Sequence, residues 1–142
     1  MPNGIILLGA SASDAEQIIR IDPLRREKLI RAAIEEGHCH IAKIGGNIAG
    51  FAVIRYSFFE HGFVELLIVA EKYRRRDIGT ALMNYLFDIC ATAKIFTSTN
   101  ESNRPMREML VKSGFTRCGQ IDALDEGDPE LFFVRVKGDP KP

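Results

Sequence analysis

Hydrophobic and polar residues follow one another along the chain in segments of helical spacing and segments of strand length. The clearest helical pattern lies at residues 78–89, where apolar side chains recur every three or four positions. Residues 63–69 are an almost continuous apolar run, and residues 47–58 form a longer one. The pattern therefore predicts a chain that combines helices and strands.

Turn and helix-end signals divide the rest of the chain. Pro23 and Gly37 are expected to begin and end a helix, and turns are expected at 45–47 and at His61–Gly62. The remaining segments complete the pattern. Strands are predicted at 4–9, 40–44, 93–99, 115–121 and 130–136, and further helices at 11–22 and 103–114. This order predicts the α+β class with a mixed sheet.

Composition and charge narrow the class of protein. The 142 residues, 46% hydrophobic and 27% charged, fit one globular domain, which we expect at residues 1–138 with a disordered tail at 139–142. The formal net charge of zero argues against a nucleic-acid partner, and the apolar runs are too short to cross a membrane. The three cysteines form no paired motif, which indicates no disulfide framework and no zinc site and favours a cytoplasmic location.

Three arginines, Arg74 to Arg76, stand immediately before the predicted helix at 78–89. The start of a helix carries partial positive charge and unpaired amide donors, so cations there are unfavourable by about 0.3–1 kcal/mol each. A bound phosphate or pyrophosphate would reverse the sign, because it would satisfy the amides and pair with the guanidinium groups. The alternative is a solvated surface run.

Two sequence blocks carry a resemblance to a known family. Residues 74–79, Arg-Arg-Arg-Asp-Ile-Gly, resemble motif A of the GNAT superfamily of N-acetyltransferases, Q/R-x-x-G-x-G/A. The segment from Asn103 to Gly114-Phe115 resembles the N-x(10)-G-F block of the same family. Together with the strand order, the resemblance covers nearly the whole chain and is closest to small bacterial members. It implies a mostly antiparallel sheet of six or seven strands, flanked by about four helices and splayed between the fourth and fifth strands.

The resemblance also implies a co-substrate and the residues that would bind it. Family members use acetyl-coenzyme A (acetyl-CoA) and no metal, and they transfer the acetyl group by direct attack of an amine on the thioester. By position, the backbone of Ile68 and Val69 would pair with the pantetheine arm, Asn103 would hydrogen-bond that arm, and Arg107 would approach the phosphate end. The pyrophosphate would lie on Arg74, Arg75, Arg76, Asp77, Ile78, Gly79 and Thr80.

The sequence departs from the family pattern at two positions. Asp77 replaces the first motif glycine, and its carboxylate would either compete for the helix amides or turn outward to pair with Arg74 or Arg75. Aspartate tolerates left-handed backbone, so the loop shape can survive. Leu110 occupies the position of the family's frequent tyrosine acid and cannot protonate a thiolate.

The sequence gives weaker signals for the general base and for the residues that would bind the acceptor amine. Glu65 is the best candidate base, because alternation places it on the same strand face as Leu67 and Val69, but a solvated glutamate is the alternative. His61 is a weaker candidate. The acidic run at 122–130 would either attract a cationic amine or form a solvated loop.

Three functions remain open from the sequence. The first is acetyl transfer to a primary amine of a small molecule or protein. The second is an acyl-CoA-binding sensor or regulatory module with little turnover, and the third is a phosphate-directed RNA-binding protein, which the neutral charge disfavours. A homodimer is common among family members, and no residue here decides it.

Overall fold

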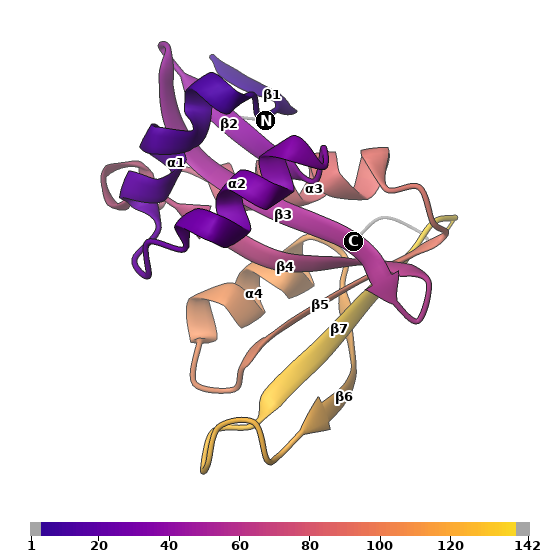
Figure 1. Cartoon of the computed structure of the whole chain (residues 1–142). Helices are drawn as coiled ribbons and strands as arrows, with labels where there is room; N and C mark the ends of the chain where they lie inside the picture. Colours follow the sequence, from indigo (N-terminus) through magenta and orange to yellow (C-terminus); the bar gives the residue numbers. More distant parts are fainter. Residues whose placement is uncertain (1–3, 139–142) are drawn as a thin grey trace. The chain divides into compact units, whose positions relative to one another are not determined.

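The structure is a computed structural model that describes residues 4–138 (Figure 1). Within that range, seven strands form one sheet in the order β1-β2-β3-β4-β5-β7-β6. The strands are β1 (Ile5–Gly9), β2 (Cys39–Ile44), β3 (Asn47–Phe58), β4 (His61–Val69), β5 (Lys94–Asn100), β6 (Thr116–Ile121) and β7 (Glu130–Val136). The helices are α1 (Ala15–Ile21), α2 (Glu27–Glu35), α3 (Ile78–Ile89) and α4 (Arg104–Lys112), with 3-10 turns η1 (Ala12–Asp14) and η2 (Glu71–Tyr73).

The direction of the strands confirms the predicted mixed sheet. Antiparallel ladders join β1 to β2, β2 to β3, β5 to β7 and β6 to β7. The parallel pair is β4 with β5, and its ladder comprises three residue pairs, from Gly62 with Ile95 to Val64 with Thr97. The predicted class, α+β with a mostly antiparallel sheet, is therefore confirmed.

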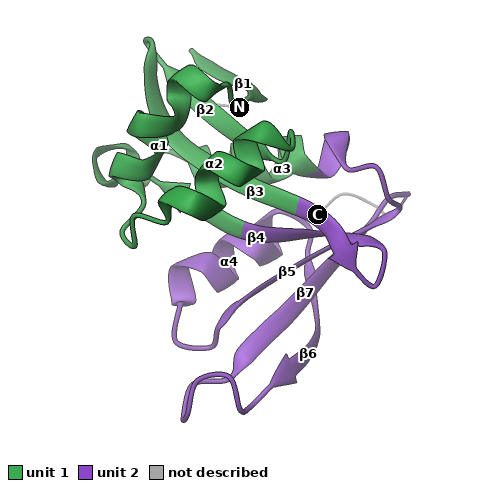
Figure 2. Ribbon diagram, viewed as in Figure 1, with its two compact units in different colours: residues 1–54, 66–86 green, residues 55–65, 87–142 purple. Residues whose placement is uncertain are grey.

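The chain divides into two compact units, shown in green and purple in Figure 2. Unit 1 comprises residues 1–54 and 66–86, and unit 2 comprises residues 55–65 and 87–142. The elements β3, β4 and α3 each pass from one unit into the other. The single domain expected at 1–138 stays a prediction, and the tail expected at 139–142 lies outside the described residues.

Unit 1 has helices on both faces of its strands. Ile18 of α1 and Ile30 of α2 pack with Ile41 and Phe51 in a fully buried cluster. His40 precedes Ile41 in β2 and so faces the other way, where it contacts Tyr85 of α3. The sheet of unit 1 therefore lies between α1 and α2 on one face and α3 on the other.

Unit 2 has its buried side chains on one face of its strands. Arg135 of β7 donates a hydrogen bond to the Ser113 carbonyl at the end of α4 and stacks on Phe87 of α3. Leu131 and Phe133, which share that face of β7, are buried. The helices of unit 2 therefore cover the face that carries Arg135.

The predicted start of the second helix at Pro23 is wrong, because α2 begins at Glu27. The carboxylate of Asp22 accepts hydrogen bonds from the amides of Leu24 and Arg26 and from the Arg26 guanidinium. These bonds hold residues 22–26 in a turn, and Pro23 lies within it. The predicted helix end is confirmed, since Gly37 follows α2 with φ 78°.

The predicted turn at His61–Gly62 is also wrong. The turn between β3 and β4 is formed by Phe59 and Glu60, which have φ values of 51° and 67°. Gly62 lies inside β4, where an added Cβ would stand 2.6 Å from the Cys90 sulfur. A glycine is therefore required at this position by packing and not by a turn.

Candidate functional site

The loop before α3 has an unusual backbone. It leads from η2 through Arg74 to Asp77, and the first intrahelical bond of α3 runs from the Ala81 amide to the Asp77 carbonyl. Arg75 has φ 65° and Asp77 has φ 58°, so two of these residues are left-handed without being glycine. Such a conformation is uncommon for non-glycine residues and persists only where the surrounding structure holds it.

Contacts with the preceding residues hold this loop. Tyr73 is buried, and the Arg76 guanidinium lies 5.6 Å from the centre of its ring. The Nε of Arg74 donates a hydrogen bond to the carbonyl of Val69 at 3.3 Å. The loop is thus attached to the end of β4 by its first arginine and to η2 by its third.

The loop gathers positive charge at a helix start. Arg74 to Arg76 are exposed, and the first turn of α3 contains no acidic residue. The opening amides of a helix lack intrahelical acceptors, and the helix dipole adds to the positive potential there. Gly79 and Thr80, in that first turn, are half-buried. The arrangement favours an anion such as a phosphate group.

The end of β4 is tightly packed in unit 1. Ile68 packs against the buried cluster of α1, α2 and β2. Gly50 of β3 lies so close that an added Cβ would stand 2.9 Å from the Ile68 carbonyl oxygen. The Ala70 amide donates to the Ala49 carbonyl at 2.8 Å. These contacts fix the backbone of Ile68 and Val69.

The residues predicted from the second sequence block lie on α4 in unit 2. Asn103 caps this helix, because its Oδ1 accepts a hydrogen bond from the Met106 amide at 3.2 Å. One turn later, the Nε of Arg107 is buried and has no hydrogen-bond partner among the described residues. An unpaired buried donor costs about 1–3 kcal/mol, so a ligand that accepts from Arg107 would be stabilised.

Leu110 and the two candidate bases also lie in unit 2. Leu110 is fully buried. Glu65 is exposed, and its Oε1 accepts a hydrogen bond from the Nε of Arg55 at 3.0 Å. His61 is half-buried, with its ring 5.4 Å from that of Phe96. Glu65 is therefore an ion-paired carboxylate at the surface.

The predicted site residues thus form two groups. The first group lies in unit 1 and consists of Ile68, Val69 and the loop 74–80. A hydrogen bond from Arg74 to the Val69 carbonyl connects the loop to the end of β4. In unit 2, Asn103 caps α4, Arg107 and Leu110 lie on this helix, and Glu65 lies on β4.

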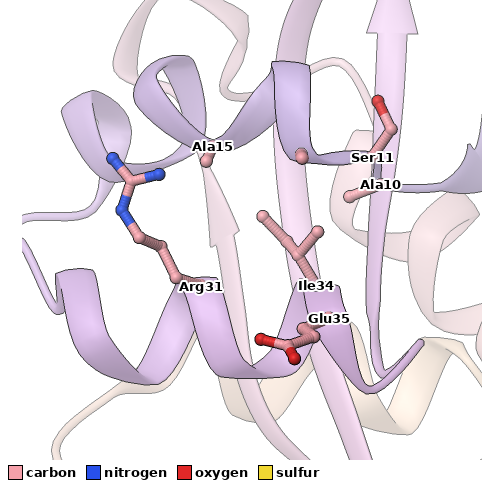
Figure 3. Close-up of a pocket in the computed structure, with 7 residues that line it drawn as sticks. Ala10, Ser11, Ala15, Arg31, Ile34 and Glu35 are labelled. Atoms are coloured by element: carbon pink, nitrogen blue, oxygen red, sulfur yellow. The ribbon is translucent and has the colours of Figure 1, made fainter.

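Unit 1 contains a pocket that the sequence did not indicate. This pocket has a volume of about 370 Å³ and lies between the start of α1 and the last turns of α2 (Figure 3). It is lined by Ala10, Ser11, Ala12, Ala15, Arg31, Ile34 and Glu35. Three alanines leave the space open, and alanine is too common in helices to signal a pocket.

A polar pair under α3 was also not predicted. The Nδ1 of His40 and the hydroxyl of Tyr85 lie 3.2 Å apart. Burial lowers the pKa of His40, and nearby His38 lowers it further, while burial raises the pKa of Tyr85. Both shifts favour the neutral forms, so this is a neutral hydrogen-bonded pair inside unit 1.

The strand order and the arginine loop before α3 are those expected from the resemblance to the GNAT family. Residues 11–115 match the model of the acetyltransferase (GNAT) family. The chain is also 38% identical to a GNAT-family acetyltransferase from Bacillus cereus ATCC 10987, with a TM-score of 0.90 over 94% of this chain and 97% of that one. This chain therefore belongs to the GNAT acetyltransferase family.

More distant structures share the fold. A putative streptothricin acetyltransferase from Bacillus anthracis, in complex with acetyl coenzyme A, is 15% identical, with a TM-score of 0.82 over 93% of this chain and 98% of that one. Ard1 from Thermoplasma volcanium is 18% identical, with a TM-score of 0.82 over 94% and 97%. No curated protein sequence matched the chain.

Within residues 4–138, no helix is both long enough and apolar enough to cross a membrane. Nor do these residues include a group of three or more side chains placed to hold a metal ion.

Proposed function

We propose that this chain is an N-acetyltransferase that moves the acetyl group of acetyl-CoA to a primary amine of a small molecule or protein. The observation that supports this most is the loop before α3, where Arg75 and Asp77 adopt left-handed backbone at the start of a helix. Three arginines and the opening amides of α3 then form one positive site in unit 1. The acetyl-CoA complex of a structural neighbour supports the same co-substrate.

The proposed roles follow the resemblance and the contacts. Arg74 to Thr80 would hold the pyrophosphate, and the backbone of Ile68 and Val69 would pair with the pantetheine arm. The Asn103 Oδ1 caps α4, so its Nδ2 is the group left to donate to that arm. Arg107 brings a buried donor without a partner, which fits a phosphate or amide oxygen of the ligand.

Transfer needs few catalytic groups. The amine nitrogen forms a bond to the thioester carbon, the carbon–sulfur bond breaks, and coenzyme A leaves as a thiolate. The ammonium proton passes to Glu65 or to water, and water protonates the thiolate, because buried Leu110 cannot do so. Positioning contributes about 7–11 kcal/mol in such reactions, more than a general acid does.

Calorimetry with acetyl-CoA tests the proposal directly. Replacing Arg75 and Arg76 by glutamine removes two cations from the loop, and we expect acetyl-CoA affinity to fall by about 10-fold or more. The matched control is Arg20→Gln, which removes an exposed cation from α1 in the same unit and leaves affinity unchanged. An intact chain that fails to bind millimolar acetyl-CoA contradicts the proposal.

The second function, an acyl-CoA sensor, has one observation in its favour. Leu110 is fully buried where the family often has a tyrosine, so no acid group is offered from that position. A screen for thiol release against many amines separates the two functions. Turnover supports the enzyme, and acetyl-CoA binding without turnover supports the sensor.

The three free cysteine thiols provide an argument about the cellular compartment of the protein. Cys39 and Cys90 are buried and Cys118 is exposed, and all three are unbridged. An exposed free thiol is stable in a reducing compartment, so we propose that the protein acts in the cytoplasm.

A further inference from the structure

Unit 2 has a cluster of phenylalanine rings on the face of its strands that is opposite to α4. Phe58 lies 4.7 Å from Phe63, 5.2 Å from Phe96 and 6.0 Å from Phe132, measured between ring centres. These four rings come from β3, β4, β5 and β7. We call this group the aromatic platform.

The register shows which face the platform occupies. Phe63 pairs with Phe96, and Ser98 pairs with Phe132, so their side chains lie on one face. Leu131 and Phe133 flank Phe132 and face the other way, toward Arg135 and α4. All four platform rings are half-buried, whereas Leu131 and Phe133 are buried. The described helices of unit 2 therefore leave the platform open on one side.

Carboxylates stand at one end of the platform. Moving two residues along each strand in the same direction leads from Phe63 to Glu65, from Phe96 to Ser98, and from Phe132 to Glu130. The Oγ of Ser98 donates to the Oε2 of Glu130 at 2.7 Å, which holds this carboxylate on the platform face.

The charge at this end is negative. Glu65 is paired with Arg55, but no basic side chain among the described residues lies within ion-pair distance of Glu130. The neighbouring loop adds two more carboxylates: Asp125 accepts a hydrogen bond from Asn100, the last residue of β5, and Asp128 accepts one from Ser102 in the turn that follows β5. An apolar surface that ends at an uncompensated carboxylate is complementary to a cation with an apolar body.

We propose that the aromatic platform binds the acceptor, and that this acceptor is a primary amine with an aromatic or bulky apolar body. Its body lies on Phe63, Phe96 and Phe132, and its ammonium group faces Glu130 and Glu65. Glu65 lies three residues before Ile68 in β4, the strand whose last residues are expected to pair with the pantetheine arm. This inference rests on the proposed function and names its substrate class.

The test compares two amines that differ in the apolar body. Thiol release is measured with 2-phenylethylamine and with ethanolamine, and binding of acetyl-CoA is measured separately by calorimetry. We expect kcat/KM for 2-phenylethylamine to exceed that for ethanolamine by at least about 10-fold, because only the aromatic amine covers the platform.

Variants locate the effect on the platform. Phe96→Ala and Phe132→Ala should lower the ratio of the two kcat/KM values toward one, and Glu130→Gln should lower both values about 10-fold. None of these variants should change the dissociation constant of acetyl-CoA. The matched control is Val111→Ala, which removes exposed apolar surface from α4 and should change no ratio. Thermal melting identifies any variant that fails to fold, and the Glu130→Gln variant retains the platform rings.

Three results overturn the inference. The first is acetyl transfer to ethanolamine as efficient as to 2-phenylethylamine, which leaves the proposed function standing. The second is a dimer in sedimentation that Phe96→Ser or Phe132→Ser converts to monomer, because a second copy then covers the platform. The third is failure of the intact chain to bind acetyl-CoA, which removes the proposed function as well.

Discussion

At the scale of single residues, the left-handed backbone of Arg75 and Asp77 is the most informative feature. A charge run before a helix is ordinary at a protein surface, but two left-handed non-glycine residues within it are not. The family pattern has a glycine where Asp77 stands, and aspartate is among the residues that enter this region at modest cost. The backbone shape has thus been kept while a negative charge has been added.

Replacing Asp77 by glycine tests this balance. Glycine adopts φ 58° without strain and removes a carboxylate from the expected phosphate site, so acetyl-CoA should bind about 3- to 10-fold more tightly. Calorimetry measures the change. The control is Asp77→Asn, which removes the charge and still tolerates left-handed backbone. Weaker binding in both variants would show that the carboxylate shapes the loop.

Gly50 gives a second prediction at this scale. An alanine Cβ there would meet the Ile68 carbonyl oxygen at 2.9 Å, so one of the two strands must shift. We expect Gly50→Ala to lower stability by about 1–3 kcal/mol and to weaken acetyl-CoA binding, because Ile68 belongs to the expected pantetheine strand. Urea unfolding and calorimetry measure the two effects. Gly9→Ala, where an added Cβ meets nothing within 4 Å, is the control.

At the scale of elements, the link between α1 and α2 depends on one carboxylate. Asp22 is 1% exposed and accepts hydrogen bonds from two backbone amides and from Arg26. The Arg26 hydrogen bond is the main cause that holds the pKa of Asp22 at about 2, against 3.8 ordinarily. The ionised carboxylate therefore stabilises the turn that sets the start of α2.

This shift predicts a pH dependence of stability. Because the folded pKa lies below the unfolded one, the stabilisation is complete above about pH 4 and is lost as the pH falls through about 2. The loss is about 2 kcal/mol. Urea unfolding of the protein and of Asp22→Asn between pH 5 and pH 2 measures it. The stability difference between them should shrink across this window, and a constant difference contradicts the assignment.

The sequence predicted most elements but misplaced two of their ends. Helical and strand spacing located α3, α4 and the strands within a few residues, because burial of one face fixes that spacing. Pro23 was assigned to a helix start, although side-chain bonds of Asp22 place it in a turn. The sequence pattern assigns Gly62 to a turn, although this residue lies in β4, where a Cβ would come too close to the Cys90 sulfur. Both errors arise from contacts that local spacing does not contain.

At the scale of the whole molecule, the two compact units share continuous elements. Because β3, β4 and α3 each run through both units, neither unit can unfold without breaking a strand or helix of the other. We predict one cooperative thermal transition, with equal calorimetric and van't Hoff enthalpies, as for a single domain. Two separate transitions would show that the units are independent.

Acetyl-CoA should raise the melting temperature of this transition. A ligand that binds the folded state alone stabilises it by about 2.7 kcal/mol at 100 times its dissociation constant. For a chain of 142 residues, with about 2.1 cal/mol/K of unfolding entropy per residue, that corresponds to a rise of roughly 9 °C. Scanning calorimetry with and without acetyl-CoA measures the shift, and S-acetylpantetheine, which lacks the pyrophosphate, serves as the control ligand that should give none.

The sequence by itself determined the α+β class, the family resemblance and the position of the arginine loop before α3. These follow from hydrophobic spacing and from residue types at fixed intervals, which are properties of neighbouring residues. Only the tertiary structure decided the left-handed backbone at Arg75 and Asp77, the burial of Leu110, and the ring cluster of Phe58, Phe63, Phe96 and Phe132. Those features depend on strand register and on packing between segments far apart in the chain, which no local pattern records.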